Sequence, residues 1–327
     1  MNSPLSNLPS IQEWHNVSLE IFNNEILKQS RPAILRGVVS DWPVVSQARH
    51  SAASASAYVA GFDNGKLVDA IMTPPEVDGR IFYNDDMSGF NFLRNQVTVT
   101  SVLSQLARYA NFASAPSVAV QSALMTECLP GFGEENQMRL LSPDIFPRIW
   151  IGNNITTPAH FDQSHNIACV TSGVRRFTVF PPEQVGNLYI GPLDFSPTPT
   201  PISMVDFNQP DLARFPKFSD ALANAQVADL NPGDAIYIPP MWWHHVQSRG
   251  ALNMLVNYWW DAPKAGTTPA LDCLLDCFEI MKKLDPDQRV AWRAMFQHYL
   301  LNSPDDVAAH IPMHKRGVLG TVDMSGL

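Results

Sequence analysis

Short hydrophobic runs separated by turn residues dominate the middle of this 327-residue chain. The runs are rich in Val, Ile and aromatic residues and are mostly bounded by Gly, Pro, Asn, Asp or Ser, a pattern that is typical of β-strands. They lie at residues 31–39, 80–83, 117–121, 148–152, 166–171, 175–180, 235–238, 244–248 and 252–259. Because Ser172 and Gly173 stand between two of these runs, a hairpin of short separate strands is predicted there. The runs at 244–248 and 252–259 are likewise expected to pair as separate strands.

Helical patterns mark both ends of the chain and two internal segments. Apolar spacing, or Ser and Ala content in one case, predicts helices within residues 1–30, 51–60, 98–110, 268–283 and 286–301. Asp285 is a predicted N-cap, and Pro286 takes the first helical position. The apolar faces of the last two helices are expected either to pack on the outside of the β-rich part or to form a homodimer interface.

Residues 191–218 hold many Pro residues and show no periodic pattern, so they are predicted to form a long loop. Insertions of this length are usually functional when they occur inside a compact domain. We therefore expect this segment to cover a functional site as a lid.

The composition of the chain argues against several classes of binding partner. The net charge of −9 argues against nucleic acid, because phosphate contacts need a basic surface. No apolar stretch is long enough to span a bilayer, and the first twelve residues lack the features of a secretory signal. The sequence therefore predicts no nucleic-acid partner, no membrane partner and a cytoplasmic location.

Two histidines and one aspartate can together bind a single metal ion. Alternate residues of a strand point to the same face, so His160 and Asp162 can bind one ion from one strand. A third ligand must come from another strand, and His244 or His245 is placed to supply it. Two imidazoles and one carboxylate form the ligand set of a mononuclear Fe(II) site with open positions. His165 is expected to line the pocket, to contact the substrate or to be a hydrogen-bonded loop residue.

Several motifs follow one another in the second half of the chain. They are Thr157-Pro158-Ala159-His160 with Asp162, Gly173-Val174-Arg175-Arg176, Pro232-Gly233-Asp234, Trp242-Trp243-His244-His245 and Asn257-Tyr258-Trp259. In this order they resemble the JmjC-type cupins, a family of Fe(II)- and 2-oxoglutarate-dependent oxygenases. This family includes the asparaginyl hydroxylase that acts on hypoxia-inducible factor and its bacterial relatives.

The resemblance implies a mainly β fold, with a double-stranded β-helix (cupin or jelly-roll) core, N-terminal α/β elements and a C-terminal helical extension. Residues 1–115 would flank the barrel, residues 116–262 would form it, and residues 263–327 would form the helical region. It also implies Fe(II) bound by His160 and Asp162, with His244 as the third ligand. Strand alternation supports His244 over its neighbour, which should point to the other face.

The same resemblance implies 2-oxoglutarate as the co-substrate. Arg175 would bind its distal carboxylate, and Thr157, Asn166 and Asn257 match positions that hydrogen-bond the co-substrate. The chain departs from the asparaginyl hydroxylase twice, with Arg175 in place of a Lys and Ala119 in place of a Tyr. We expect the longer cation and the missing hydroxyl to compensate for each other.

The implied activity is hydroxylation of a protein side chain or a small molecule, with release of succinate and CO2. A protein, peptide or small molecule would then be the substrate. The alternative is a metal-binding cupin of another class, either an isomerase or a non-catalytic binding or sensing protein. Within the oxygenases, demethylation competes with stable hydroxylation.

Overall fold

The computed structural model describes residue 5 and residues 8–261, 269–302 and 307–319. Contacts between residues divide the chain into two compact units, Met1–Lys264 and Ala265–Leu327. All strands of the described residues lie in the first unit, and the described part of the second unit is helical. The predicted boundary between residues 115 and 116 stays a prediction.

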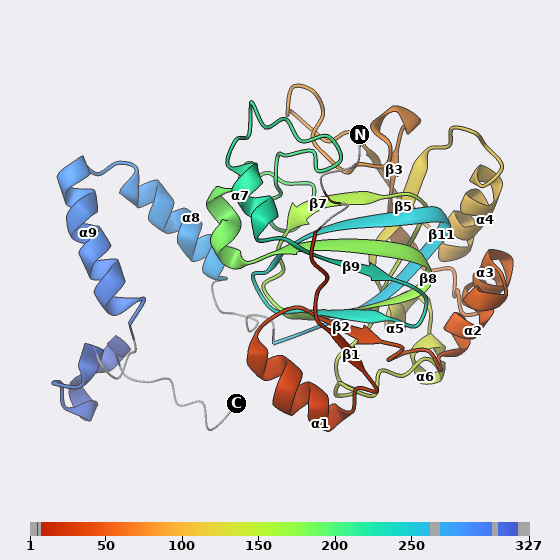
Figure 1. Cartoon of the computed structure of the whole chain (residues 1–327), viewed down its shortest axis with the longest axis horizontal. Coiled ribbons are helices and arrows are strands. Elements are labelled where there is room, and N and C mark those ends of the chain that lie inside the picture. The colour runs from red at the N-terminus through yellow and green to blue at the C-terminus, as the bar shows by residue number, and fades with distance from the viewer. Residues whose placement is uncertain (1–4, 6–7, 262–268, 303–306, 320–327) are drawn as a thin grey trace. The chain divides into compact units, whose positions relative to one another are not determined.

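Strands form the body of the first unit (Figure 1). In the described residues they make one sheet in the order β1-β2-β10-β8-β11-β6-β5-β3-β4, with β7 beside β11 and β9 beside β8. Their bounds are β1 Glu13–His15, β2 Ala33–Arg36, β3 Val68–Thr73, β4 Leu93–Val97, β5 Ser117–Leu124, β6 Arg148–Gly152, β7 Thr156–His160, β8 His165–Phe180, β9 Gln226–Leu230, β10 Ala235–Ile238 and β11 Trp243–Trp260.

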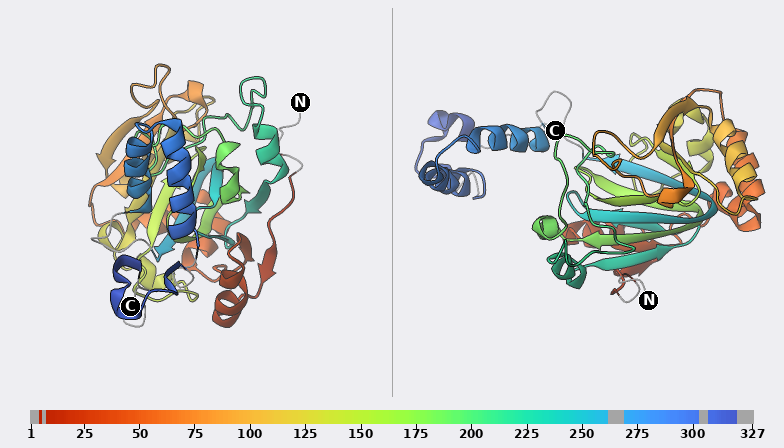
Figure 2. Two further views of the ribbon diagram at one scale, coloured as in Figure 1. Left: turned by 90° about the vertical axis from the view of Figure 1, so that its left-hand side faces the viewer. Right: turned by 90° about the horizontal axis from the view of Figure 1, so that it is seen from above.

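The helices of the first unit are short and lie around this sheet (Figure 2). They are α1 Leu19–Ile21, α2 Pro43–His50, α3 Ala52–Ala60, α4 Val99–Tyr109, α5 Met125–Cys128, α6 Phe132–Glu135 and α7 Phe218–Ala223. A π-helical turn at Phe22–Ile26 and 3-10 turns at Leu27–Gln29, Pro75–Val77 and Pro182–Gly186 complete the set. None of the helices in the described residues combines the length and the apolar character that crossing a bilayer requires.

The two longest strands, β8 and β11, determine the architecture. They run antiparallel along their whole length, with Trp243 opposite Phe180 and Trp260 opposite His165. Strands β6 and β10 flank one half of this pair, and β7 and β9 flank the other half. Side chains from both halves pack into one buried cluster, which includes Ala168, Val170, Phe177, Val179, Ala228, Leu230, Ile236 and Leu255. The sheet therefore curls round a common interior, and the predicted jelly-roll fold is confirmed.

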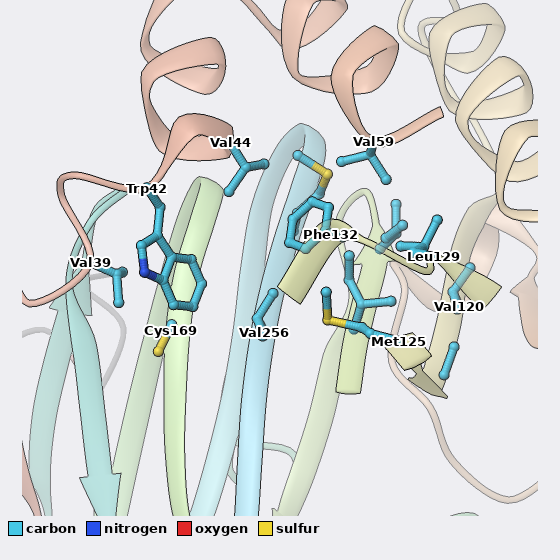
Figure 3. Packing of buried hydrophobic residues seen from close by; sticks show 14 of the residues in the cluster. Val39, Trp42, Val44, Val59, Val120, Met125, Leu129, Phe132, Cys169 and Val256 are labelled. Atoms are coloured by element: carbon cyan, nitrogen blue, oxygen red, sulfur yellow. The ribbon is translucent and has the colours of Figure 1, made fainter. Parts of the chain in front are cut away.

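Alternation along β8 and β11 separates an inner face from an outer face. Ala168 and Leu255 face the interior, whereas their neighbours Cys169 and Val256 belong to a second cluster beneath the N-terminal helices. Figure 3 shows Trp42 above Cys169 at the start of α2, with the helices capping the strands. Helix packing on the outer face fixes the register of the strands, and this register decides which side chains line the interior.

The predicted hairpin of separate strands was wrong, because the chain does not reverse at Ser172-Gly173. Gly173 has φ 74°, and the pairing register shifts between Arg249 and Met254 on the facing strand. The extra residues belong to β11, where residues 250–253 stand against the single residue Gly173, and the glycine allows β8 to bend there without ending. For the same reason residues 244–248 and 252–259 form one strand, β11, instead of two.

Other differences lie in the N-terminal half. The helical prediction within residues 1–30 is confirmed from Leu19 to Gln29, where α, π and 3-10 turns follow one another directly, whereas Glu13–His15 form strand β1. Residues 80–83 form only isolated bridges. The helices expected at 51–60 and 98–110 are confirmed by α3 and α4. Strand β4 was missed because its residues are mostly polar and exposed, so they give no apolar signal.

The second unit contains α8 Ala270–Met281 and α9 Pro286–Tyr299, followed by 3-10 turns at Met313–Lys315 and Gly317–Leu319. The predicted start of α9 is confirmed, because Asp285 and Gln288 form a reciprocal capping box and Pro286 follows the cap. Packing of these helices on the barrel and formation of a homodimer both stay predictions.

Replacing Gly173 with Ala should lower the free energy of unfolding by about 2 kcal/mol or more. A Cβ there would lie 2.4 Å from the Asn253 Oδ1 and 2.6 Å from the Leu252 carbonyl oxygen, at a left-handed φ. Urea unfolding measures the change. The control is Gly186→Ala, where an added Cβ meets nothing within 4 Å. Equal effects of the two substitutions would contradict the role given to the bulge.

Candidate metal centre and its pocket

A cavity of about 400 Å³ opens into the interior of the barrel. Its wall carries the three predicted metal ligands together with Arg175 and Phe177 from β8. The remaining predicted co-substrate residues also lie on this wall; they are Thr157, Asn166 and Asn257. The structure thus brings every predicted site residue into one pocket, whose volume is in the range typical of small-molecule sites.

His160, Asp162 and His244 form a cluster in which one ligand atom from each residue lies within 4.8 Å of the others. His160 ends β7 and pairs directly with His244 on β11. Their ring centroids are 4.3 Å apart. Asp162 lies two residues beyond β7 and not on the strand, so the expectation that one strand supplies both ligands was wrong. Phe161 and Asp162 continue the chain beyond the strand without regular structure, and Asp162 still reaches the cluster.

Backbone carbonyls set the tautomer of both imidazoles. His160 Nδ1 lies 2.9 Å from the Pro158 carbonyl oxygen, and His244 Nδ1 lies 3.0 Å from the Trp242 carbonyl oxygen. Because a carbonyl oxygen can only accept, each Nδ1 carries a proton and each Nε2 presents a lone pair. Burial, with a smaller effect of His244, lowers the pKa of His160 to about 4. In both rings Nε2 is thus the atom that can bind a metal ion.

A chain of hydrogen bonds orients the Asp162 carboxylate. Its Oδ2 accepts from Asn166 Nδ2 at 3.0 Å and from Trp259 Nε1 at 3.1 Å. Asn257 donates to Asn166 Oδ1 at 3.3 Å and accepts from Trp150 Nε1 at 2.9 Å. Asn166 and Asn257 therefore connect the carboxylate to the barrel wall, a role that the sequence did not indicate.

The other two candidate histidines lie elsewhere. His245 stacks on Phe207 with ring centroids 4.5 Å apart, and burial, with smaller effects of Arg80 and His160, lowers its pKa to about 3. His165 Nδ1 lies 2.8 Å from the Tyr237 hydroxyl, and its ring lines a different pocket. The geometry thus agrees with His244 as the third ligand, with His245 turned to the opposite face.

Arg175 points into the cavity, as alternation from Phe177 predicts. Its Nε is buried without a hydrogen-bond partner in the described part of the chain, and burial lowers its pKa to about 10. The neighbouring Arg176 turns the other way and donates to the Leu5 carbonyl oxygen at 2.8 Å. A small cavity of about 20 Å³ lies beside Arg175 and is lined by Ala119 and Gly152. A buried cation without a partner is costly unless an anion binds it.

The predicted loop between residues 191 and 218 supplies part of the pocket wall through Pro197, Thr198 and Pro199. Just beyond these residues, the Thr200 hydroxyl donates to the Phe161 carbonyl oxygen at 2.6 Å. The Ser203 N–H donates to the Ala159 carbonyl oxygen at 2.8 Å. The loop is thus attached to the segment that carries the metal ligands.

Four residues at the mouth of the pocket were missed by sequence reasoning; they are Asp69, Arg94, Ser122 and Arg148. Asp69 and Arg94 come from β3 and β4, which the sequence did not predict. Arg148 could have been found, because it shares a face with Trp150 on a predicted strand. Arg94 Nη1 lies 2.9 Å from Asp69 Oδ2, so this ion pair is neutral overall.

Residues 18–266 match the profile of the cupin-like domain family. The chain belongs to the cupin-like family. JmjC domain-containing protein D of Dictyostelium discoideum is 26% identical over 239 residues, which are 71% of this chain and 52% of that protein. Lysine-specific demethylase 8 of Danio rerio is 27% identical over 266 residues, which are 79% of this chain and 59% of that protein.

A shorter match links this cupin-like protein to human HSPB1-associated protein 1, with 33% identity over 113 residues, 34% of this chain and 22% of the relative. The chain spans 52% and 59% of the two longer relatives it matches. The predicted membership of the JmjC-type cupins is confirmed by the profile and by the names of these relatives.

Replacing His244 with Ala should abolish stoichiometric Fe(II) binding, because two ligands cannot complete the facial set. Replacing the adjacent His245 with Ala should leave the iron content unchanged, since its ring faces Phe207. Iron per protein after anaerobic loading and gel filtration measures both. Loss of iron in the His245 variant alone would overturn the assignment, and unfolding curves for each variant identify misfolded material.

Proposed function

We propose that this cupin-like protein is an Fe(II)- and 2-oxoglutarate-dependent dioxygenase that hydroxylates a carbon atom of a protein side chain or small molecule. One observation carries the proposal: a His-Asp-His cluster shares its cavity with Arg175, whose buried Nε has no hydrogen-bond partner among the described residues. A metal site alone fits many cupins. The cation adds a requirement for an anionic ligand within reach of the metal.

The three proposed metal ligands fit Fe(II). His160 and His244 present lone pairs on Nε2, and Asp162 supplies a carboxylate that two hydrogen bonds orient. Three protein ligands leave positions open for a chelating acid and for dioxygen. The backbone carbonyls that fix each imidazole support the site in the way that outer hydrogen bonds support known metal ligands.

The pocket also fits 2-oxoglutarate. The Arg175 guanidinium can bind the distal carboxylate through two parallel hydrogen bonds, which would satisfy its buried N–H groups. We assign Thr157, Asn166 and Asn257 to the same ligand, because they line the wall between Arg175 and the metal ligands. The small cavity beside Arg175 and Ala119 leaves room where the asparaginyl hydroxylase has a tyrosine, and the compensation between the longer cation and the missing hydroxyl stays a prediction.

When bound, iron would couple the oxidative decarboxylation of 2-oxoglutarate to the insertion of one dioxygen atom into a substrate C–H bond, giving succinate and CO2. The protein contributes orientation and exclusion of water. Phe177, Val246 and Leu255 give the pocket an apolar lining beside Arg175. Such a lining strengthens the Arg175–carboxylate interaction and protects the reacting centre from solvent.

Demethylation is the competing activity, because the relative from Danio rerio is named a lysine-specific demethylase. We favour stable hydroxylation, since Arg148 places a positive charge at the mouth of the pocket where a methylated lysine would bring another. An isomerase or a sensing cupin remains the alternative outside the oxygenases, and it would leave Arg175 without a ligand. The expected cytoplasmic location stays a prediction.

Anaerobically iron-loaded protein that receives 2-oxoglutarate and then air should form succinate, even without substrate. Uncoupled turnover of this kind needs the metal, the co-substrate and dioxygen, together with ascorbate, which supplies the two electrons that the absent substrate would give. Mass spectrometry quantifies succinate against a His244→Ala control. Succinate at the control level in the wild-type protein would favour the non-oxygenase alternative. Formaldehyde released from a methylated lysine peptide would favour demethylation.

Replacing Arg175 with Ala should raise the dissociation constant for 2-oxoglutarate by about 30-fold or more, because a buried charge pair typically contributes 2 kcal/mol or more. Iron content should stay unchanged. Anaerobic titration of iron-loaded protein measures both quantities. Arg176→Ala is the matched control, since its guanidinium contacts Leu5 outside the pocket. An unchanged dissociation constant in the Arg175 variant would refute its role, and Arg175→Lys should restore part of the affinity.

A further inference from the structure

Arg148 lies on the pocket wall close to the candidate metal centre, but it has no part in the proposed binding of iron or 2-oxoglutarate. It begins β6 and faces the pocket together with Trp150. Its guanidinium carbon lies 5.8 Å from the ring centroid of Trp259, the residue whose Nε1 donates to Asp162. Arg148 is thus separated from a metal ligand by a single side chain.

An unusual backbone conformation holds Arg148 in this position. Ser122 has φ 48°, and the register between β5 and β6 shifts between Val120 and Ala123. The carbonyl oxygen of Ser122 accepts a hydrogen bond from Arg148 Nη1 at 2.9 Å. A non-glycine residue in the left-handed region costs free energy and occurs preferentially at functional sites, as do bulges that redirect side chains. The bulge therefore orients a guanidinium that is still free to bind a ligand through its other N–H groups.

The charge of Arg148 has no acidic partner among the described residues. Lys66, with a smaller effect of Arg148, lowers the pKa of Glu127, but this carboxylate is exposed and forms its ion pair with Lys66. Asp69, the other acid at the mouth, is paired with Arg94. In the proposed complex Asp162 faces the metal and Arg175 faces the co-substrate, so their charges are matched. Among the described residues, the positive charge of Arg148 then stays without an acidic partner on the wall of the same pocket.

We propose that Arg148 determines specificity for a substrate that carries a carboxylate near the carbon to be oxidised. This rests on the proposed function for the identity of the reaction. A guanidinium binds a carboxylate through two parallel hydrogen bonds, and the half-buried setting strengthens the pairing. A cationic side chain at the same place would be repelled. The carboxylate belongs either to an acidic residue of a peptide or to a small organic acid.

Binding to anaerobic protein loaded with iron and saturated with 2-oxoglutarate tests this assignment. The probes are capped pentapeptides Gly-Gly-X-Gly-Gly with Glu, Gln or Lys at X, and the same three residues as capped single amino acids. Calorimetry should give a dissociation constant about 10-fold lower for Glu than for Gln in at least one of the two formats. Lys should bind more weakly than Gln. A stronger preference for Glu among the pentapeptides indicates an acidic residue of a peptide as the substrate. A stronger preference among the capped amino acids indicates a small organic acid.

The variants Arg148→Gln and Arg148→Lys test whether the preference for the Glu probe over the Gln probe depends on Arg148. The Gln variant should reduce the preference for Glu over Gln to less than about 2-fold, and the Lys variant should keep part of it, since only Lys retains the charge. Arg176→Gln is the matched control, and it should keep the full preference because the Arg176 guanidinium contacts the Leu5 carbonyl oxygen outside the pocket. Unfolding midpoints and iron content confirm that each variant is folded.

Equal binding of the Glu and Gln probes, stronger binding of Lys, no binding of any probe, or a preference that survives in Arg148→Gln would each overturn the assignment. Succinate formation is measured separately on the wild-type protein. If succinate is absent while the Arg148-dependent preference remains, the proposed oxygenase activity fails and the anion site stands.

Discussion

The antiparallel pairing of β8 with β11 is the interaction on which the candidate site depends. It places His244 beside the end of β7 and directs Arg175 into the same interior. Both strands are long because Gly173 permits a bend in place of a turn. A continuous ladder holds its side chains more rigidly than loops would, and a metal site needs that rigidity to keep its ligands at fixed separations.

Burial gives the pocket its chemical character. The same desolvation that keeps His160 neutral leaves the Nε of Arg175 buried without a partner. In an apolar core such a cation would destabilise the fold, because the loss of hydration is not offset. The barrel retains it on the wall of a cavity, where a ligand can supply the missing acceptors. Stability and affinity for an anion are thus coupled at this position.

The sequence predicted the central strands of the sheet and the three residues that come together in the His-Asp-His cluster, and it failed where the signal depends on tertiary context. Short apolar runs and the His160 and His244 motifs are local patterns, so they could be recognised directly. The bend at Gly173 could not, because a glycine between two strands signals a turn or a bulge equally well. Strand β4 is polar and exposed, so Arg94 gave no indication that it reaches the pocket. Strand β7 ends at His160, so the position of Asp162 beyond the strand could not be predicted from strand alternation.

The loop that carries Thr198 was expected to act as a lid, and its attachments connect any such motion to the candidate metal ligands. Thr200 and Ser203 hydrogen-bond to the backbone of Phe161 and Ala159, on either side of His160. Swinging this loop outward would pull on the segment that holds the first imidazole. Opening of the pocket on this side would therefore disturb the His-Asp-His cluster, so a lid that moves freely and a cluster with fixed geometry exclude each other here.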